Sequence, residues 1–342
     1  MKVDYHFHLE EGPYSLSWIQ RTIESLREGY QTKGSESSYQ ESLRLAELLK
    51  NRMDVGEYSR EWFSLYLNKA KEIGLKEVGI VDHLYRFIEY KSYYEKYIDI
   101  HSDELGKLQK YWLDQICIRS IGEFVSFIET EKKVWEKEGI QLKLGMEADY
   151  FPGGEDELKE ILSEYPYDYI IGSVHFQNGW GFDNPQTQWK FEETPSLNLY
   201  HIHFDILESA IKSDLFDIIA HLDNLKVFGF RPDENELKHY YVKIAKLLKQ
   251  HDIATEVNAG LFYRYPIKEM CPSPTFLSVL AENDVAVTTS SDAHYPEDLG
   301  KYNSLQLEML RSNGFSQIAT FSKRKRYMRD LNERIGTMSE NK

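Results

Sequence analysis

Seven short apolar segments, separated by longer amphipathic ones, constrain the fold of this chain more than any other feature. The apolar segments have the length and composition of buried strands, and they span residues 1–7, 77–81, 141–146, 167–172, 216–220, 253–257 and 285–289. Amphipathic helical patterns span residues 39–51, 59–73, 155–163, 197–213, 234–250 and 275–282. Strands that alternate with helices run parallel and are joined by right-handed crossovers. We therefore predict an α/β fold, and seven such units favour a closed or nearly closed barrel over an open sheet.

Two segments are too long to be simple crossovers between strands. Residues 35–63 and 85–139 are rich in Tyr, Lys, Glu and Leu, and we interpret them as helical insertions in one barrel domain spanning residues 1–342. They would serve either as extra packing helices or as a lid that shapes the substrate site. Residues 317–321 are a weaker eighth strand candidate. The tail from Ser322, with its basic run at residues 323–326, is predicted to be a solvated helix.

Charge and cysteine content exclude several classes of partner. Lys and Arg number 41 against 56 Asp and Glu, so the net charge is −15, which argues against nucleic acid as a partner. No apolar run approaches the roughly 18 residues of a membrane span, so no membrane partner is expected. Cys117 and Cys271 are expected to be reduced structural thiols of a cytoplasmic protein. The oligomeric state stays open.

Each of the seven predicted strands leads into residues that bind metals or exchange protons. In chain order they are His6 and His8, Asp82 and His83, Glu147, His175, His221 and Asp223, Glu256 and Asn258, and Asp292 and His294. The carboxyl ends of parallel strands meet at one mouth of a barrel, so these side chains should face one another. Imidazole combined with carboxylate suits zinc, iron or manganese. The sequence therefore predicts a metal centre at the barrel mouth.

The spacing within the first strand supports a shared ion. Residues two apart in a strand point to the same face, so His6 and His8 can reach one ion, and Glu10 would continue that face. His201 and His203 have the same spacing but lie in a predicted helix, where residues two apart point in nearly opposite directions, so we assign them as structural.

Cationic side chains near the predicted strand ends are candidates for phosphate recognition. Arg86 follows His83 by three residues, while Arg231 and Arg264 follow the fifth and sixth strands. A guanidinium group can bind phosphate through two parallel hydrogen bonds. Arg264 is the favoured candidate because it comes just after residues 256–260.

The motifs in this order resemble the PHP family, named for polymerase and histidinol phosphatase. They are His-x-His at residues 6–8, Asp-His at 82–83, Glu147, Ser-Val-His at 173–175, Ala-His-Leu-Asp at 220–223, Glu-Val-Asn at 256–258 and Ser-Ser-Asp-Ala-His at 290–294. Residues 145–153, 172–176, 180–183 and 256–274 look like the histidinol-phosphatase branch in particular. The resemblance covers residues 1 to about 320.

This resemblance implies a distorted seven-stranded, TIM-like β/α barrel with two or three divalent ions, which would be zinc, iron or manganese. The implied ligands are His6, His8, Glu147 and Asp292 for one ion, Glu147 with His175 and His221 for a second, and His83 and His294 for a third. Glu10, or alternatively Glu11, takes the remaining ligand position of the third ion. Asp82, Asp223 and Glu256 would orient ligands or take part in catalysis, and Asn258 would help to bind substrate.

The predicted activity is hydrolysis of a phosphate monoester, with a hydroxide that bridges two ions attacking phosphorus. The resemblance points to L-histidinol phosphate, a substrate of histidine biosynthesis. Three alternatives stay open: a related phosphatase for another small phosphoester, a phosphodiesterase or nuclease, and a metal-binding protein without catalytic activity.

Overall fold

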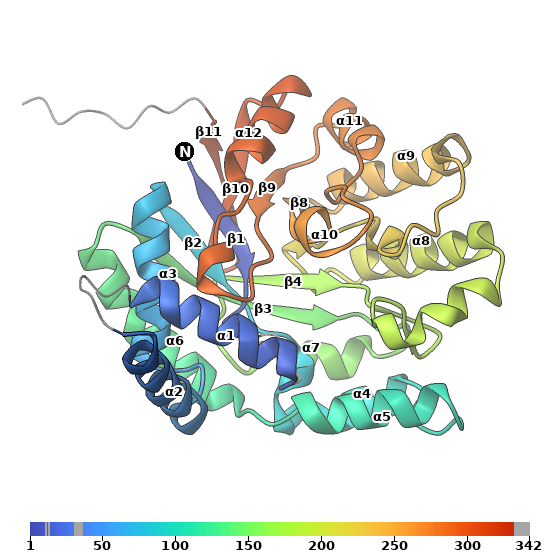
Figure 1. Cartoon of the computed structure of the whole chain (residues 1–342). Helices are drawn as coiled ribbons and strands as arrows, with labels where there is room; N and C mark the ends of the chain where they lie inside the picture. Colours follow the sequence, from blue (N-terminus) through green and yellow to red (C-terminus); the bar gives the residue numbers. More distant parts are fainter. Residues whose placement is uncertain (11, 13, 31–36, 332–342) are drawn as a thin grey trace, which may run out of the picture.

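A parallel sheet forms the centre of the molecule, which is represented by a computed structural model that describes residues 1–10, 12, 14–30 and 37–331. Its strands, in their order across the sheet, are β1 (Val3–Phe7), β2 (Glu77–Ile80), β3 (Gln141–Asp149), β4 (Tyr169–Ser173), β7 (Ile218–Ile219), β8 (Ala254–Asn258) and β9 (Val287–Ser290). Every neighbouring pair in this order runs parallel. The seven predicted strands and the α/β barrel are therefore confirmed (Figure 1).

The sheet curves until its two edges almost meet. The amide of His8 donates to the carbonyl oxygen of Ala293 at 2.7 Å, and the amide of Asp292 donates to that of His6 at 2.8 Å. These contacts join the segment after β9 to the end of β1. The nearly closed barrel therefore places Asp292 directly beside the His6–His8 pair.

The six predicted helices are present with small changes of boundary. They are α2 (Ser38–Val55), α3 (Arg60–Ile73), α7 (Glu155–Ser163), α8 (Ser196–Lys212), α9 (Glu234–Gln250) and α11 (Pro274–Glu282). Further elements that the periodicity did not single out are α1 (Leu16–Gly29), α10 (Gly260–Arg264), α12 (Asn303–Ser312), the β5 (Phe176–Gln177) and β6 (Trp180–Gly181) hairpin, and the short turns η3 (Pro185–Glu192), η4 (Asn224–Lys226) and η5 (Pro296–Asp298). Ser15 caps α1 by accepting a hydrogen bond from the amide of Trp18.

Both predicted insertions are helical where the structure describes them. The first supplies α2, which lies beside α1, and the second supplies η1 (Leu84–Arg86), η2 (Ile88–Tyr90), α4 (Lys91–Tyr97), α5 (Leu105–Ile116) and α6 (Ile121–Lys137). Helix α6 packs against β3, whereas α4 and α5 both lie at the lower edge of the molecule as it is viewed in Figure 1. Within the described ranges, no helix is both long and apolar enough to span a membrane.

The prediction for the C-terminal tail is wrong. Residues 317–330 form an antiparallel hairpin of β10 (Gln317–Ser322) and β11 (Lys325–Asp330), and β10 does not join the barrel sheet. Two arginines of the basic run pair with distant carboxylates, Arg324 with Asp217 and Arg326 with Asp252. These long-range ion pairs and the hairpin ladder replace the expected solvated helix.

Aromatic side chains fill the end of the barrel opposite to the predicted ligands. The ring of Phe321 in β10 lies 5.5 Å from that of Tyr5 and 5.9 Å from that of Tyr169. A Cβ atom on Gly145 would lie 2.5 Å from Cζ of Tyr169, so this position has no room for a side chain. The packed aromatic end leaves the carboxyl ends of the strands as the open mouth.

Candidate metal centre

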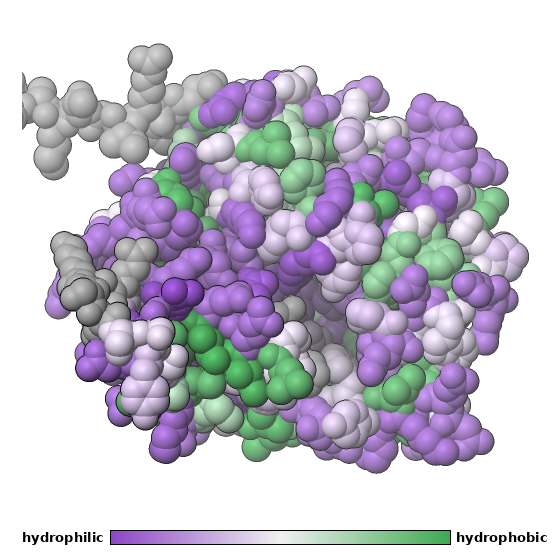
Figure 2. Space-filling model, viewed as in Figure 1, coloured by the Kyte–Doolittle hydropathy of each residue, from purple (hydrophilic) through white to green (hydrophobic). Residues whose placement is uncertain are grey.

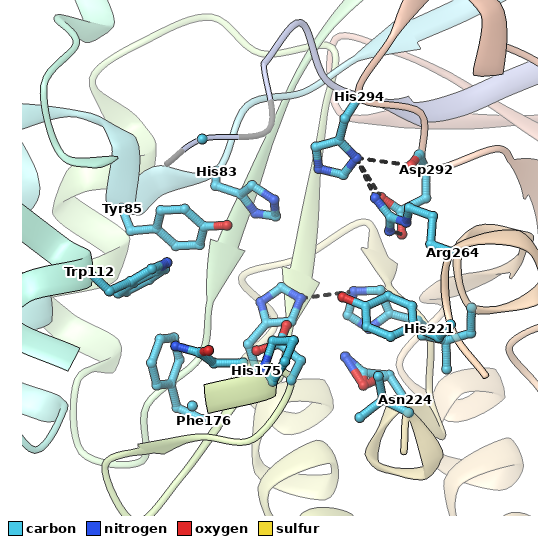
Figure 3. A pocket seen from close by; sticks show the side chains of 18 of the residues that line it. His83, Tyr85, Trp112, His175, Phe176, His221, Asn224, Arg264, Asp292 and His294 are labelled. Carbon is cyan, nitrogen blue, oxygen red and sulfur yellow. Dashed lines mark hydrogen bonds and ion pairs between the residues drawn. The ribbon is translucent and has the colours of Figure 1, made fainter. Parts of the chain in front are cut away.

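Eight of the nine predicted metal ligands converge at the carboxyl ends of the strands. Three groups have potential ligand atoms within 4.8 Å of one another: His6, His8 and Asp292; His83, Glu147 and His175; and His8, His83 and His294. His221 adjoins the second group, with its Nε2 3.2 Å from Nε2 of His175. The four imidazoles of His83, His175, His221 and His294 point into one shared space (Figure 3).

Glu147 lies at the centre of this arrangement. Its Oε2 atom is 3.1 Å from Nε2 of His6 and 2.9 Å from Nδ1 of His83. Its Oε1 atom is 3.3 Å from Nε2 of His221 and 3.6 Å from Nε2 of His175. Each oxygen thus faces a different set of histidines, which is the arrangement that a carboxylate bridging two ions requires.

Several ring nitrogens of the centre lie within hydrogen-bond distance of one another. The Nε2 atoms of His6 and His8 are 3.2 Å apart, although one of them must carry a proton to donate to the other. Burial and the neighbouring His83 lower the pKa of His8 to about 3, and its Nδ1 atom has no hydrogen-bond partner among the described residues. Buried lone pairs that converge without protons fit cations, so the donor set fits divalent metal ions.

Carboxylates hold the other ring nitrogen of two predicted ligands. Nδ1 of His6 is 3.1 Å from Oε2 of Glu256, and Nδ1 of His175 is 2.8 Å from Oδ1 of Asp149. Burial lowers the pKa of His175, but Asp149, with Asp183 and Glu147, outweighs burial and raises that pKa to about 10 in the metal-free chain. Such partners fix the tautomer and the ring orientation of a metal ligand. The sequence prediction includes Glu256 but omits Asp149, although Asp149 follows Glu147 by two residues on the same strand face.

Arg264 and Asn258 lie at the edge of the ligand cluster, as predicted. Nη2 of Arg264 donates to Oδ2 of Asp292 at 2.7 Å, and its Nη1 contacts Nδ1 of His294. Nδ2 of Asn258 donates to Oε1 of Glu256 at 2.9 Å and to Oδ2 of Asp292 at 3.3 Å. Both side chains line the same cavity as the histidines, which is consistent with contact to a bound phosphate.

Two other predicted phosphate-binding residues lie elsewhere. Arg86 is fully buried, with Nη2 2.6 Å from Oε1 of Glu57 and Nε 3.1 Å from Oδ1 of Asp82. Arg231 pairs with Glu269 at 2.6 Å beside a second, shallow pocket. Neither arginine is among the described residues that line the cavity, so the geometry does not favour phosphate contact by either.

Glu10 and the two aspartates that were predicted as supporting residues also have defined partners. Glu10 accepts hydrogen bonds from Nη2 of Arg52 at 2.5 Å and from Nε1 of Trp18, and Glu11 lies outside the described residues. Asp223 pairs with the buried Lys226 at 2.8 Å. Asp82 accepts a hydrogen bond from the amide of His83 at 2.9 Å, as expected for a group that orients this ligand. A ligand role for Glu10 remains a prediction, because both of its carboxylate oxygens face other donors.

The cavity above the ligands has a volume of about 540 Å³ and opens near the middle of one face (Figure 2). One wall is aromatic, with Tyr85, Trp112 and Phe176, and lies opposite Arg264 and Asp292 (Figure 3). Asp183 also lines the cavity, and its carboxylate has no hydrogen bond or ion pair within the described part of the chain. Burial raises the pKa of Asp183, an effect that nearby His175 opposes. No strand periodicity marks Asp183 or Trp112, so the sequence prediction does not include them.

Comparisons with known proteins agree with this geometry. The chain is 32% identical over 219 residues to a protein of Deinococcus radiodurans named "Probable histidinol-phosphatase". This alignment covers 63% of this chain and 81% of that protein. It shares its fold with the crystal structure of histidinol phosphate phosphatase from Lactococcus lactis, complexed with zinc, L-histidinol and phosphate. That match has a TM-score of 0.59 and 16% identity, and covers 95% of this chain and 98% of the other. The family model described as "PHP domain" matches residues 60–260. The chain belongs to the PHP family.

Proposed function

We propose that this protein is a metal-dependent phosphomonoesterase that converts L-histidinol phosphate to L-histidinol and phosphate. The observation that carries the proposal is the position of Glu147, whose two oxygens face separate groups of histidines in the cavity that Arg264 also lines. The histidinol phosphatases among its relatives support the same substrate.

Divalent ions held by His6, His8, His83, Glu147, His175, His221, Asp292 and His294 would supply positive charge that acidifies water and offsets the charge of the phosphate. The side chains around them have separate tasks. Glu256 and Asp149 keep His6 and His175 in the orientation that leaves Nε2 facing the centre. Asp292 holds the guanidinium group of Arg264 at the cavity edge, where it can bind phosphoryl oxygens as their charge develops.

The cavity wall away from the phosphate side suits an aromatic, cationic leaving group. Trp112 and Tyr85 provide ring faces, with centroids 4.9 Å apart, on which an imidazole ring can pack. Asp183 offers a carboxylate that makes no hydrogen bond or ion pair within the described part of the chain, and an ammonium group would pair with it. L-Histidinol carries both an imidazole and an ammonium group, so this wall supports the substrate that we propose.

The alternatives differ in what they require of the cavity. A nuclease needs a basic groove for the nucleic acid backbone, whereas this chain carries a net charge of −15. A phosphatase for another small ester would share all of the ligands and differ only in the wall opposite Arg264. A metal-binding protein without activity would retain the ions but release no phosphate.

A panel of phosphate esters, tested with manganese or zinc supplied, separates these functions. We expect L-histidinol phosphate to give the highest kcat/KM, with sugar phosphates, nucleotides and single-stranded DNA far below it. A different ester at the top of the panel would refute the substrate, and no phosphate release from any ester would refute the activity.

The location of the protein is also a proposal. Cys117 and Cys271 are both buried free thiols. Unpaired thiols are typical of a reducing compartment, which is in keeping with the predicted cytoplasmic location.

A further inference from the structure

A cluster of charged side chains adjoins the predicted metal ligands and includes residues of both helical insertions. We call it the arginine network, and its members are Arg52, Arg86, Arg119, Glu10, Glu57 and Asp82. Three guanidinium groups balance three carboxylates, so the network as a whole is neutral. Both insertions contribute to it, Arg52 and Glu57 from the first and Arg86 and Arg119 from the second.

Glu57 is the hub of the arginine network. It is fully buried just after α2, and its carboxylate faces all three arginines. Nη2 of Arg86 lies 2.6 Å from Oε1, Nη2 of Arg119 lies 2.5 Å from Oε2, and Nη1 of Arg52 lies 3.8 Å from Oε2. The three arginines outweigh burial and keep the pKa of Glu57 below its ordinary value, so the carboxylate is charged at neutral pH. Glu57 of the first insertion therefore contacts the second insertion through its ion pairs with Arg86 and Arg119.

One arm of the network reaches the end of β1. Arg52 is buried, donates to Glu10 at 2.5 Å, and its guanidinium group lies 4.8 Å from the ring centroid of Trp62. Nε1 of Trp62 in turn donates to the carbonyl oxygen of Leu9 at 2.9 Å. The backbone that follows His8 is therefore held by a side chain from α2 and another from α3.

The other arm reaches the end of β2. Arg86 lies 3.1 Å from Oδ1 of Asp82, and that same oxygen accepts a hydrogen bond from the amide of His83 at 2.9 Å. The hydroxyl of Tyr58, which follows Glu57, donates to Oδ2 of Asp82 at 2.7 Å. The Glu57 segment therefore also fixes the backbone that carries His83.

A buried ionic network is a poor source of stability, because desolvation offsets most of the attraction between its charges. The best-documented use of such groups is to select one geometry. Here the two arms end at His8 and His83, whose imidazole rings stack with centroids 4.2 Å apart and form one ligand group with His294.

We propose that Arg52 and Glu57 are positioning residues of the metal centre, which set the affinity of the ion held by His8, His83 and His294. This inference rests on the proposed function only in that the centre binds metal ions. It gives both insertions a task at the metal centre, whereas only the second one lines the cavity within the described residues. His8 also belongs to the group with His6 and Asp292, and His83 to the group with Glu147 and His175, but only the third group contains both. The third ion therefore depends most on the arginine network.

Zinc titration of the full-length protein tests this inference. Metal-free protein is titrated with zinc in competition with a chromophoric chelator, which yields an affinity for each equivalent bound. We expect Arg52→Met and Glu57→Gln to weaken the third equivalent about 10- to 100-fold, the range for residues that orient metal ligands, and to weaken the first two by a clearly smaller factor. Arg52→Lys should recover part of the loss. Arg60→Met is the matched control, since Arg60 is 67% exposed and its partner, Glu131, lies outside the arginine network.

If a single variant fails to fold, the double variant Arg52→Met/Glu57→Gln takes its place. It removes one charge of each sign, so the network stays neutral. The inference is overturned if the folded double variant binds zinc like the wild-type protein, or if the wild-type protein binds no third equivalent. It is also overturned if all equivalents weaken together as the metal-free protein loses thermal stability, because that result describes a purely structural role. Zinc binding by a wild-type protein that hydrolyses no ester would refute the proposed function alone.

Discussion

Asp183→Asn is the substitution that most directly separates recognition of a cationic leaving group from phosphate chemistry. Asp183 is half-buried at the cavity wall, so water screens its charge only in part. A carboxylate and an ammonium group about 4 Å apart attract by about 4 kcal/mol at an effective dielectric constant of about 20, before the cost of desolvation. Asn preserves the shape and a weaker dipole, so we expect a net loss of about 1.5–3 kcal/mol, roughly 10- to 150-fold in kcat/KM for L-histidinol phosphate.

The assay compares two esters in the same variant. A phosphomonoester whose leaving group is uncharged should react at nearly the wild-type rate, because the centre around Glu147 is unchanged. Asp156→Asn is a matched control, since Asp156 is exposed on α7 and does not line the cavity. An equal loss for both esters would show that Asp183 supports the metal centre instead of the leaving group, and no loss for either would refute the assigned role.

Three further substitutions test other parts of the site. Arg264→Ala removes the guanidinium group held by Asp292, so kcat/KM should fall by about 1.5–3 kcal/mol for every ester, and unchanged kinetics would reject its phosphate role. Glu147→Ala should abolish turnover and reduce metal content while circular dichroism shows a retained fold, and substantial residual activity would contradict a bridging role. Arg231→Ala should leave kcat/KM unchanged, because Arg231 pairs with Glu269 outside the cavity, and a loss similar to that of Arg264→Ala would restore it as a phosphate ligand.

The barrel and most of its candidate ligands are predictable because they follow local rules. A strand repeats every two residues, so the His6–His8 pair and the run of ligands at strand ends can be located without knowledge of long-range contacts. The same rule also places Asp149, two residues after Glu147, on the ligand face, so the sequence alone could have identified it. The helix that contains His203 can likewise be predicted from its local periodicity. Nε2 of His203 lies 2.9 Å from the carbonyl oxygen of Leu222, as expected for a structural histidine.

Features that depend on distant partners could not be predicted in this way. The basic run after Ser322 has the charge pattern of a solvated segment, but pairing of Arg324 with Asp217, 107 positions away, helps to fix a hairpin. Strand alternation predicts Glu10 on the ligand face, whereas in the structure Arg52, 42 positions away, donates a hydrogen bond to one of its oxygens. Asp183 becomes a candidate only when the loop after β6 folds over the barrel mouth.

Metal content and phosphate release, measured together on one preparation, test the central claim most directly. Protein purified without chelator should contain at least two equivalents of zinc, iron or manganese per chain, as the ligand groups around Glu147 require. Removal of the metal should abolish release of phosphate from L-histidinol phosphate, and reloading with zinc or manganese should restore it. Full activity of the metal-free protein would contradict the account.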